Sequence, residues 1–168
     1  IAICTFLTSR IFGNSFFDKQ LLSRGIAISK GREQILLSET TIKEYAKNRF
    51  TQLSEKNKVS QGIKKLVDNK DTEGYIISKN KTFIGKIRLI DIINKSDDEI
   101  IKHKQIKPLI LDSKISLLDT IKKLSNFVGE SVPIVDKSNN NFIGIISEND
   151  VLEAYLNISD EINHIEKD

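Results

Sequence analysis

Apolar residues recur with a helical period around residue 120. Residues three and four apart lie on one side of a helix, so this run predicts a helix with one buried face. Ser116 and Asp119 have the spacing of a helix cap and its partner, which places the start of the helix after Ser116. The predicted buried face consists of Leu117, Leu118, Ile121 and Leu124.

On both sides of this helix the pattern changes to short β-rich runs. Pro108–Leu111 predicts a strand before the helix, and Ser131–Val135 and Asn141–Ile146 predict a strand pair joined by a polar turn. A closing helix is expected at Glu148–Leu156. The expected order is therefore strand, helix, strand, strand, helix.

The preceding part of the chain shows the same order of patterns. The expected elements are a strand at Thr51–Leu53, a helix at Val59–Asp68, strands at Gly74–Ile77 and Thr82–Ile87, and a helix at Leu89–Ile93.

Residue identities show that the two halves are copies of one unit. Ile63-Lys64-Lys65-Leu66 recurs 58 residues later as Ile121-Lys122-Lys123-Leu124, and Phe83-Ile84-Gly85 recurs 59 residues later as Phe142-Ile143-Gly144. The single added residue falls in the polar turn Ser138–Asn141. One copy of about 55 residues would bury little apolar surface alone, so we expect the copies to pack through their sheets with pseudo-twofold symmetry.

Composition and charge narrow the class of protein. The chain has 168 residues, 39% hydrophobic and 29% charged, which is typical of a globular domain. Its lone cysteine, Cys4, cannot form an intramolecular disulfide, which favours an intracellular, reducing compartment. A net charge of +3 with both signs interspersed does not predict nucleic-acid binding.

The beginning of the chain is apolar and is followed by a basic stretch. Ile1–Phe12 is too short to span a bilayer, and we expect it to be the tail of a longer membrane helix. Residues 1–50 hold eight Lys and Arg against four acids, as on the cytoplasmic flank of a membrane helix. The alternatives are a solvated basic face and an amphipathic helix that packs Ile1, Ile3, Leu7 and Ile11 on the domain.

The repeated unit resembles the CBS (cystathionine-β-synthase-type) domain. Ser131–Leu152 carries the pattern V-P-I-V-D, a turn, then G-h-h-S-x-x-D, whereas Tyr75–Ile93 is a looser match with Tyr75 for proline and Arg88 for serine or threonine. The resemblance implies an α/β (α+β) fold of tandem β-α-β-β-α repeats, preceded by a helical linker. The expected divisions are 1–41 (end of a membrane helix and basic linker), 42–95 and 96–157 (the two CBS domains), and 158–168 (acidic tail).

A second resemblance lies upstream. Arg10–Ile26, extended by Gly31-Arg32-Glu33, is similar to the segment that links the last membrane helix to the CBS pair in ClC-family chloride channels and proton-coupled chloride transporters. It implies a homodimeric regulatory pair at the cytoplasmic face of the cell (inner) membrane, attached to the membrane-embedded transport domain of the same polypeptide. The alternatives are a dimerisation module that binds no ligand, and the CBS pair of another membrane transporter or of an enzyme.

The CBS resemblance also implies a ligand site. Clefts between CBS domains can hold AMP, ADP or ATP, and the matching positions for phosphate and ribose are Ser147 and Asp150, with Pro133 and Ile134 on the neighbouring strand. A hydroxyl and free N–H groups at a helix start suit phosphate, and a carboxylate can accept both ribose hydroxyls. Ser147-x-x-Asp150 could equally be a capping box that satisfies its own helix.

The first copy presents a weaker version of this site. Asp91 is kept, but Arg88 replaces the hydroxyl and Lys86 lies nearby. A cation there could still meet a phosphate, although it is more typical of a solvated strand end. Thr51 could offer its backbone or hydroxyl to a base, and Tyr75 is included as a ligand candidate although a core position suits it better.

Motifs for catalysis are absent from the sequence, so we expect no enzyme and no resident cofactor. Nothing resembles a P-loop, a G-x-S-x-G elbow or H-E-x-x-H. Cys4, His103 and His164 fit no metal spacing. Ser96–Glu99 and Glu161–Asp168 are expected to be solvated linkers or ends.

Overall fold

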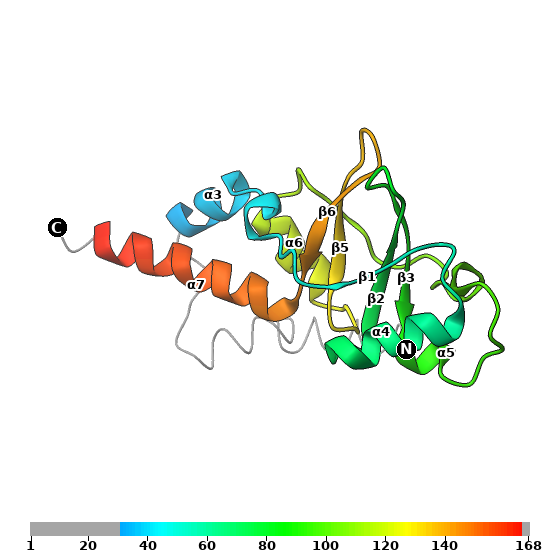
Figure 1. Cartoon of the computed structure of the whole chain (residues 1–168). Coiled ribbons are helices and arrows are strands. Elements are labelled where there is room, and N and C mark those ends of the chain that lie inside the picture. Colours follow the sequence, from blue (N-terminus) through cyan, green and yellow to red (C-terminus); the bar gives the residue numbers. More distant parts are fainter. Residues whose placement is uncertain (1–30, 166–168) are drawn as a thin grey trace, which may run out of the picture.

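Two small sheets, each with its own helices, make up the described part of the chain (Figure 1). The structure is a computed structural model that describes residues 31–165, and the side chains of residues 33–161. Its elements are α3 (Gly31–Glu39), η1 (Ile42–Tyr45), β1 (Thr51–Leu53), α4 (Val59–Asn69), β2 (Glu73–Ile77), β3 (Phe83–Arg88), α5 (Leu89–Ile92), η2 (Ile100–His103), β4 (Leu111–Asp112), α6 (Leu117–Leu124), β5 (Val132–Asp136), β6 (Asn141–Ile146) and α7 (Glu148–Ile165).

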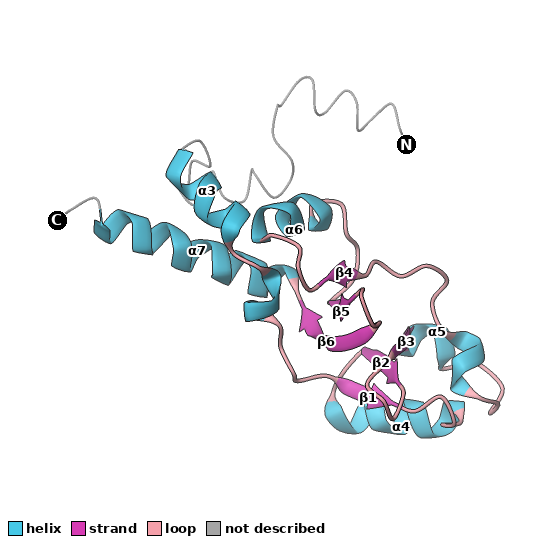
Figure 2. Ribbon diagram, turned by 90° about the horizontal axis from the view of Figure 1, so that it is seen from above, coloured by secondary structure: helices cyan, strands magenta, loops and turns pink. Residues whose placement is uncertain are grey.

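The two sheets have the same topology. Each has three strands, in the orders β1-β2-β3 and β4-β5-β6, with the first pair parallel and the second pair an antiparallel hairpin. Figure 2 shows the strands of both copies between α4 and α5 on one side and α3, α6 and α7 on the other. The predicted α+β fold of two β-α-β-β-α units is therefore confirmed.

Several predicted element boundaries are confirmed, and the predicted position of one strand is wrong. β1 and β6 have the predicted bounds, and α6 begins after Ser116, whose Oγ accepts a hydrogen bond of 3.1 Å from the Asp119 N–H. β4, predicted at Pro108–Leu111, pairs with β5 only at Leu111 and Asp112. The reason is local, because Lys107 is left-handed with φ of 53° and Pro108 has no N–H to donate.

The closing helix extends into the segment predicted as an acidic tail, in which Asp160 and Glu161 are exposed. α7 was expected to end at Leu156 but continues to Ile165. α3 packs on both α6 and α7, which buries Leu37 and Ile158, and Ser159 Oγ donates to Glu33 Oε1 at 2.9 Å. The helix is longer than predicted because α3, from the expected linker, covers its apolar face.

Each copy is preceded by a connector that binds the last strand of the other copy. Lys47, before the first sheet, exchanges backbone hydrogen bonds of 2.8 and 3.0 Å with Ile145 of β6. Gln105, before the second sheet, donates 2.8 Å to the Lys86 carbonyl of β3. Residues 42–47, which the sequence assigns to the first copy, therefore pack on the second, and Ile42 is fully buried in that core.

The segment expected to be a solvated linker, Ser96–Glu99, is largely exposed, and it also caps the first helix of the first copy. Asp97 Oδ1 accepts 2.9 Å from the Ser60 N–H, and the Asp98 carbonyl accepts 3.0 Å from the Val59 N–H. The hydrogen bond from the Ser60 backbone lowers the pKa of Asp97. Charged residues in this segment therefore satisfy free N–H groups at the start of α4.

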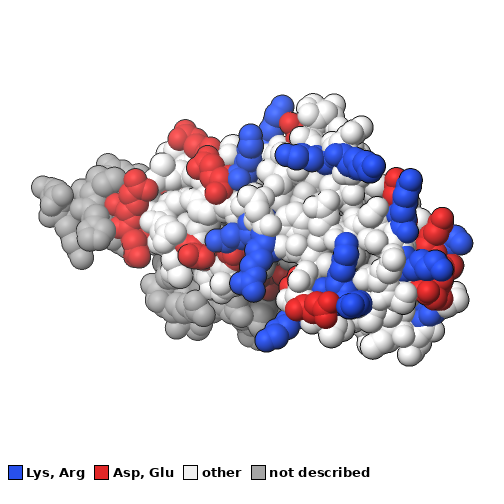
Figure 3. Space-filling view, viewed as in Figure 1, with Lys and Arg blue, Asp and Glu red and all other residues white. Residues whose placement is uncertain are grey.

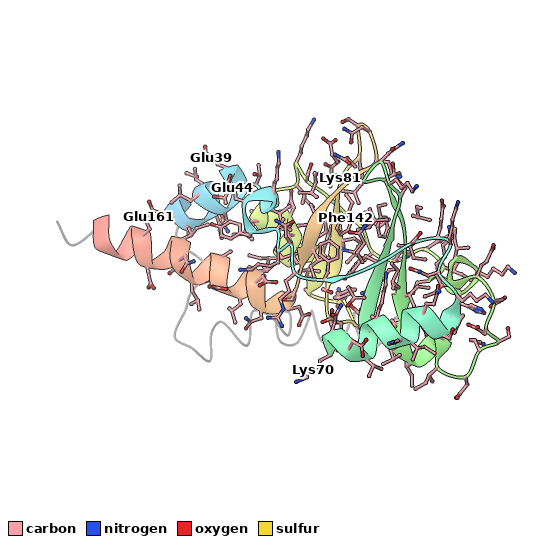
Figure 4. All side chains as sticks on the ribbon, in the orientation of Figure 1. Glu39, Glu44, Lys70, Lys81, Phe142 and Glu161 are labelled. Carbon is pink, nitrogen blue, oxygen red and sulfur yellow. The ribbon has the colours of Figure 1, made fainter. Side chains whose placement is uncertain are left out.

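The two sheets meet through an aromatic core. It contains Tyr75, Ile77, Phe83, Val135 and Phe142, with Phe83 and Phe142 stacked at 5.8 Å between ring centroids. At the hairpin tips, near the labelled Lys81 and Phe142 in Figure 4, Phe142 N–H donates to the Lys81 carbonyl and Phe83 N–H donates to the Asn140 carbonyl. Lys81 and Asn140 are equivalent positions, and both are left-handed, with φ of 61° and 56°.

Charged side chains join the opposite end of the same interface. Lys86 Nζ lies 2.7 Å from Glu73 Oε2 and donates 2.6 Å to the Ser131 carbonyl. The Ser131 N–H and Oγ both donate 3.1 Å to Glu73 Oε2, and Tyr75 shares a hydrogen bond of 2.5 Å with Ser131 Oγ. Lys86 is only 3% exposed, so the expectation of a solvated strand-end lysine is wrong. We call these four residues the Glu73 cluster.

We expect Glu73→Ala to lower the free energy of unfolding by about 3–5 kcal/mol, because it leaves the Lys86 ammonium buried without its counter-charge. Urea unfolding followed by circular dichroism measures this. The control is Glu55→Ala, which removes an exposed glutamate of the same copy and should leave stability nearly unchanged. A loss below about 1 kcal/mol for Glu73→Ala would show that the cluster does not hold the copies together.

Candidate functional site

Ser147 and Asp150 lie at the start of α7, directly after β6. The Ser147 N–H and Oγ donate to Asp150 Oδ2 at 2.8 and 2.6 Å, and the Asp150 N–H donates 3.2 Å to Ser147 Oγ. The capping box that the sequence allowed as an alternative is therefore formed. It uses one carboxylate oxygen of Asp150 and leaves Oδ1 for another partner.

That partner is Lys47 of the connector, which sequence reasoning did not include. Lys47 Nζ lies 3.8 Å from Asp150 Oδ1, and its side chain is about half exposed. A Cβ on Gly144 would lie 2.7 Å from the Lys47 carbonyl oxygen, so only glycine lets the connector pass this close to β6. Gly144, the glycine of the G-h-h-S-x-x-D pattern, was the feature of the sequence that could have indicated a close crossing by another segment.

Pro133 and Ile134 lie in β5, beside β6 and opposite Ile145 and Gly144. Ile134 is fully buried in the core of the second copy, among residues that include Leu111 and Val151. Its side chain therefore packs the fold, and Pro133, also buried, lies on the other side of the strand, because successive strand side chains alternate.

Thr51 and Tyr75 are engaged inside the protein. Thr51 Oγ1 donates 2.6 Å to Asp71 Oδ2 and accepts 2.8 Å from Asn69 Nδ2, and the residue is 1% exposed. Tyr75 is also 1% exposed, in the aromatic core, and burial raises the pKa of its hydroxyl. Tyr75 is therefore a core residue, as the sequence favoured, and it is not placed to stack on a base.

Asp91, the first-copy counterpart of Asp150, is held by Arg88. Arg88 Nε donates 2.7 Å to Asp91 Oδ2, and its Nη2 donates 2.8 Å to Asp91 Oδ1. These hydrogen bonds raise the pKa of Arg88. A hollow of about 560 Å³ lies beside Asp91, and its lining includes Asn94, Lys95, Lys102, His103 and Lys104.

The structure thus brings Ser147 and Asp150 together with Lys47, and places the other candidates elsewhere. Within the described residues no three metal-ligating side chains form a cluster, and His103 lies 2.6 Å from Asp98. Cys4 and the side chain of His164 lie outside the described part. In Figure 3, Lys and Arg are interspersed with Asp and Glu over the described part of that face.

Comparison with known proteins agrees with the fold. Residues 101–157 match the sequence model of the CBS domain. CbpB in complex with c-di-AMP superposes with a TM-score of 0.68 at 16% identity, over 79% of this chain and 95% of that one. CBSX2 in complex with AMP superposes with a TM-score of 0.62 at 20% identity, over 71% of this chain and 98% of that one. The structure of CBSX2 from Arabidopsis thaliana superposes with a TM-score of 0.61 at 20% identity, over 71% of this chain and 96% of that one.

The chain has the fold of a tandem CBS-domain pair. The soluble part of a magnesium transporter shares this fold, with a TM-score of 0.62 at 18% identity, over 77% of this chain and 52% of that one. The uncharacterized protein MJ0188 of Methanocaldococcus jannaschii is 25% identical over 118 residues, which are 68% of this chain. This chain spans less than half of that relative, 44% of its length.

Between residues 31 and 165, no helix combines the length and hydropathy that crossing a membrane requires. The segments that suggested a membrane helix and a ClC-type linker, Ile1–Phe12 and Arg10–Ile26, lie outside the described residues.

We expect Ser147→Ala to lower the free energy of unfolding of the CBS pair by about 1 kcal/mol, because it removes the N-cap acceptor for the Asp150 N–H. Thermal unfolding in the absence of nucleotide measures this. Asn149→Ala changes an exposed residue of the same turn and should have little effect. Equal stability of Ser147→Ala and wild type would mean that the capping box contributes nothing to α7.

Proposed function

We propose that this CBS pair is a non-catalytic regulatory module that binds an adenine nucleotide at Ser147 and Asp150. Binding would bias ion transport by a ClC-type chloride channel or chloride/proton antiporter, with the module at the cytoplasmic face of the cell membrane. The observation that carries the nucleotide part is the second motif, where Asp150 Oδ1 remains outside the capping box and faces a cation of the connector.

The chemistry of this site suits a nucleoside phosphate. The start of the 18-residue helix α7 supplies N–H groups and the positive end of a helix dipole. Asp150 can accept hydrogen bonds from ribose hydroxyls, while Ser147 Oγ and Lys47 Nζ can donate to phosphate. Solved CBS pairs in complex with AMP and c-di-AMP support an adenine nucleotide as the class of ligand.

The assignment to a transporter is supported by sequence and by one relative. Arg10–Ile26 and Gly31–Glu33 resemble the linker of ClC proteins, and the soluble part of a magnesium transporter has this fold. Another membrane transporter is therefore the nearest rival to a ClC protein. Transport measurements with chloride and with magnesium distinguish the two.

We infer that the module is a homodimer that pairs through the α4–α5 face. Val67 of α4, Ile90 of α5 and Ile93, directly after α5, are 57%, 74% and 51% exposed. The equivalent α6–α7 face of the second copy is covered by α3. A second copy of this chain would cover the exposed apolar side chains with identical ones, as an isologous contact requires.

A different function is a dimerisation module that binds no ligand. The observation that favours it is internal bonding, because Thr51, Tyr75 and Asp91 all have their polar atoms engaged within the chain. Such a module would act only by holding two copies of a larger protein together.

We expect AMP, ADP or ATP to raise the melting temperature of the chain by several degrees, because a ligand that binds only the folded state stabilises it. The shift should vanish in Asp150→Ala and remain in Asp160→Ala, which removes an exposed carboxylate from the same helix. Asp150→Asn keeps an acceptor for the cap but loses the charge, so it separates loss of binding from loss of the helix start.

The readout is the shift that nucleotide causes in each variant, not the melting temperature without ligand. If wild type shows no shift with any of the three nucleotides at millimolar concentration, the ligand-free dimerisation module becomes the better account. If Asp160→Ala loses the shift together with Asp150→Ala, the effect does not belong to the second motif.

In the full-length polypeptide we expect removal of the module, from Gly31 onward, to change chloride flux or its gating. A regulatory domain can act only if the two transport states differ in free energy of interaction with it or with its ligand. Flux is measured in vesicles for the full-length and the truncated polypeptide. The mass of each dimer is measured in detergent to exclude an assembly defect. Identical flux and gating at equal dimer mass would remove the regulatory proposal.

A further inference from the structure

The two copies differ in charge at three equivalent positions. Glu73, Lys86 and Arg88 of the first copy correspond to Ser131, Ile145 and Ser147 of the second, at the repeat offsets of 58, 59 and 59 residues. Each first-copy residue is charged, and each second-copy residue is neutral. The pseudo-twofold symmetry of the backbone therefore does not extend to the chemistry around the two motifs.

We propose that the chain's own charges occupy the first motif, Arg88 to Asp91. The CBS pair would then hold one nucleotide per chain, at the second motif, Ser147 to Asp150. This inference rests on the proposed nucleotide function and specifies its stoichiometry. Three sets of contacts carry it.

The first set concerns the motif carboxylate. Both oxygens of Asp91 accept hydrogen bonds from Arg88, at 2.7 and 2.8 Å. The pair is bidentate, which is favourable geometry, although both side chains are partly exposed, and a ribose would have to compete with it for both carboxylate oxygens. Asp150 instead uses Oδ2 for its own cap and has Lys47 at 3.8 Å from Oδ1, beyond hydrogen-bond distance.

The second set concerns the position after the motif glycine. In the second copy Ile145 packs against the aromatic core, whereas in the first copy Lys86 directs its ammonium to Ser131 of the other copy. Lys86 Nζ also lies 5.5 Å from the Phe127 ring centroid and 6.0 Å from that of Tyr75. Desolvation lowers the pKa of Lys86, which is the cost of burying this cation.

The third set concerns Glu73, which neutralises the buried cation. Its carboxylate lies 2.7 Å from Lys86 Nζ and accepts from the Ser131 N–H and Oγ at 3.1 Å. A phosphate that approached Lys86 would meet this carboxylate and would have to separate a buried ion pair, which is strongly unfavourable. The first motif therefore already contains the opposite charges that a ligand would need to bring.

Isothermal titration of the 168-residue chain with AMP tests the inference. We expect one site per chain, unchanged affinity in Asp91→Asn, and at least tenfold weaker binding in Asp150→Asn. Two sites per chain in wild type, or a comparable loss in Asp91→Asn, would overturn the inference and leave the proposed function intact. If AMP does not bind, the titration is repeated with ADP and ATP, and absence of binding by all three would overturn the proposed function, and the inference with it.

A gain-of-site variant tests the cause. Glu73→Ser, Lys86→Ile and Arg88→Ser together give the first copy the residues of the second, and we expect two AMP sites per chain. The control is Glu55→Ser, Lys56→Ile and Lys79→Ser, which removes the same charges from exposed positions of the same copy and should keep one site.

Circular dichroism and melting establish that both variants fold. A folded triple variant that still binds one AMP would show that the copy's own charges are not what closes the first motif. If the triple variant does not fold, Arg88→Ser alone leaves the buried pair intact and frees Asp91. One weak additional site is then expected, and its absence counts against the inference.

Discussion

Each copy has helices over one face of its three-stranded sheet and depends on the other copy to cover the opposite face. The stacked rings of Phe83 and Phe142 and the burial of Tyr75, Ile77 and Val135 show where the two uncovered faces meet. A unit of about 55 residues has too little interior of its own, so this contact is a condition of folding. The hairpin turns at one end and the Glu73 cluster at the other fix the angle at which the sheets meet.

The same packing makes the candidate site. Because the connector before each copy binds the last strand of the other, Lys47 reaches Asp150, a residue more than 100 positions away in the chain. A ligand at Asp150 would therefore contact the segment that leads into the first copy as well as the helix that ends the second. Regulation by such a site needs no long relay, because any change in the relation of the two copies alters it directly.

The two copies differ in how the charges at their motifs are paired. The second motif keeps a neutral hydroxyl and a carboxylate oxygen outside the cap. The first carries Arg88 against Asp91 and Lys86 against Glu73, charges that satisfy one another. A buried ion pair often gives no more net stability than an apolar contact, but its geometry tolerates few arrangements. It therefore favours one register of the two sheets.

The sequence by itself determined the local structure and the repeat. Period-two and helical patterns gave β1, β6, α6 and the order of elements, and the offset between copies gave the pseudo-symmetry, because these depend on neighbours along the chain. It did not determine which distant groups meet. Four tertiary contacts were missed or predicted wrongly: the cap of α4 by Asp97, the packing of α3 on α7, the burial of Lys86 and the approach of Lys47 to Asp150. Charge and polarity in a sequence indicate exposure on average, whereas only the folded chain decides which polar groups are paired and can be buried.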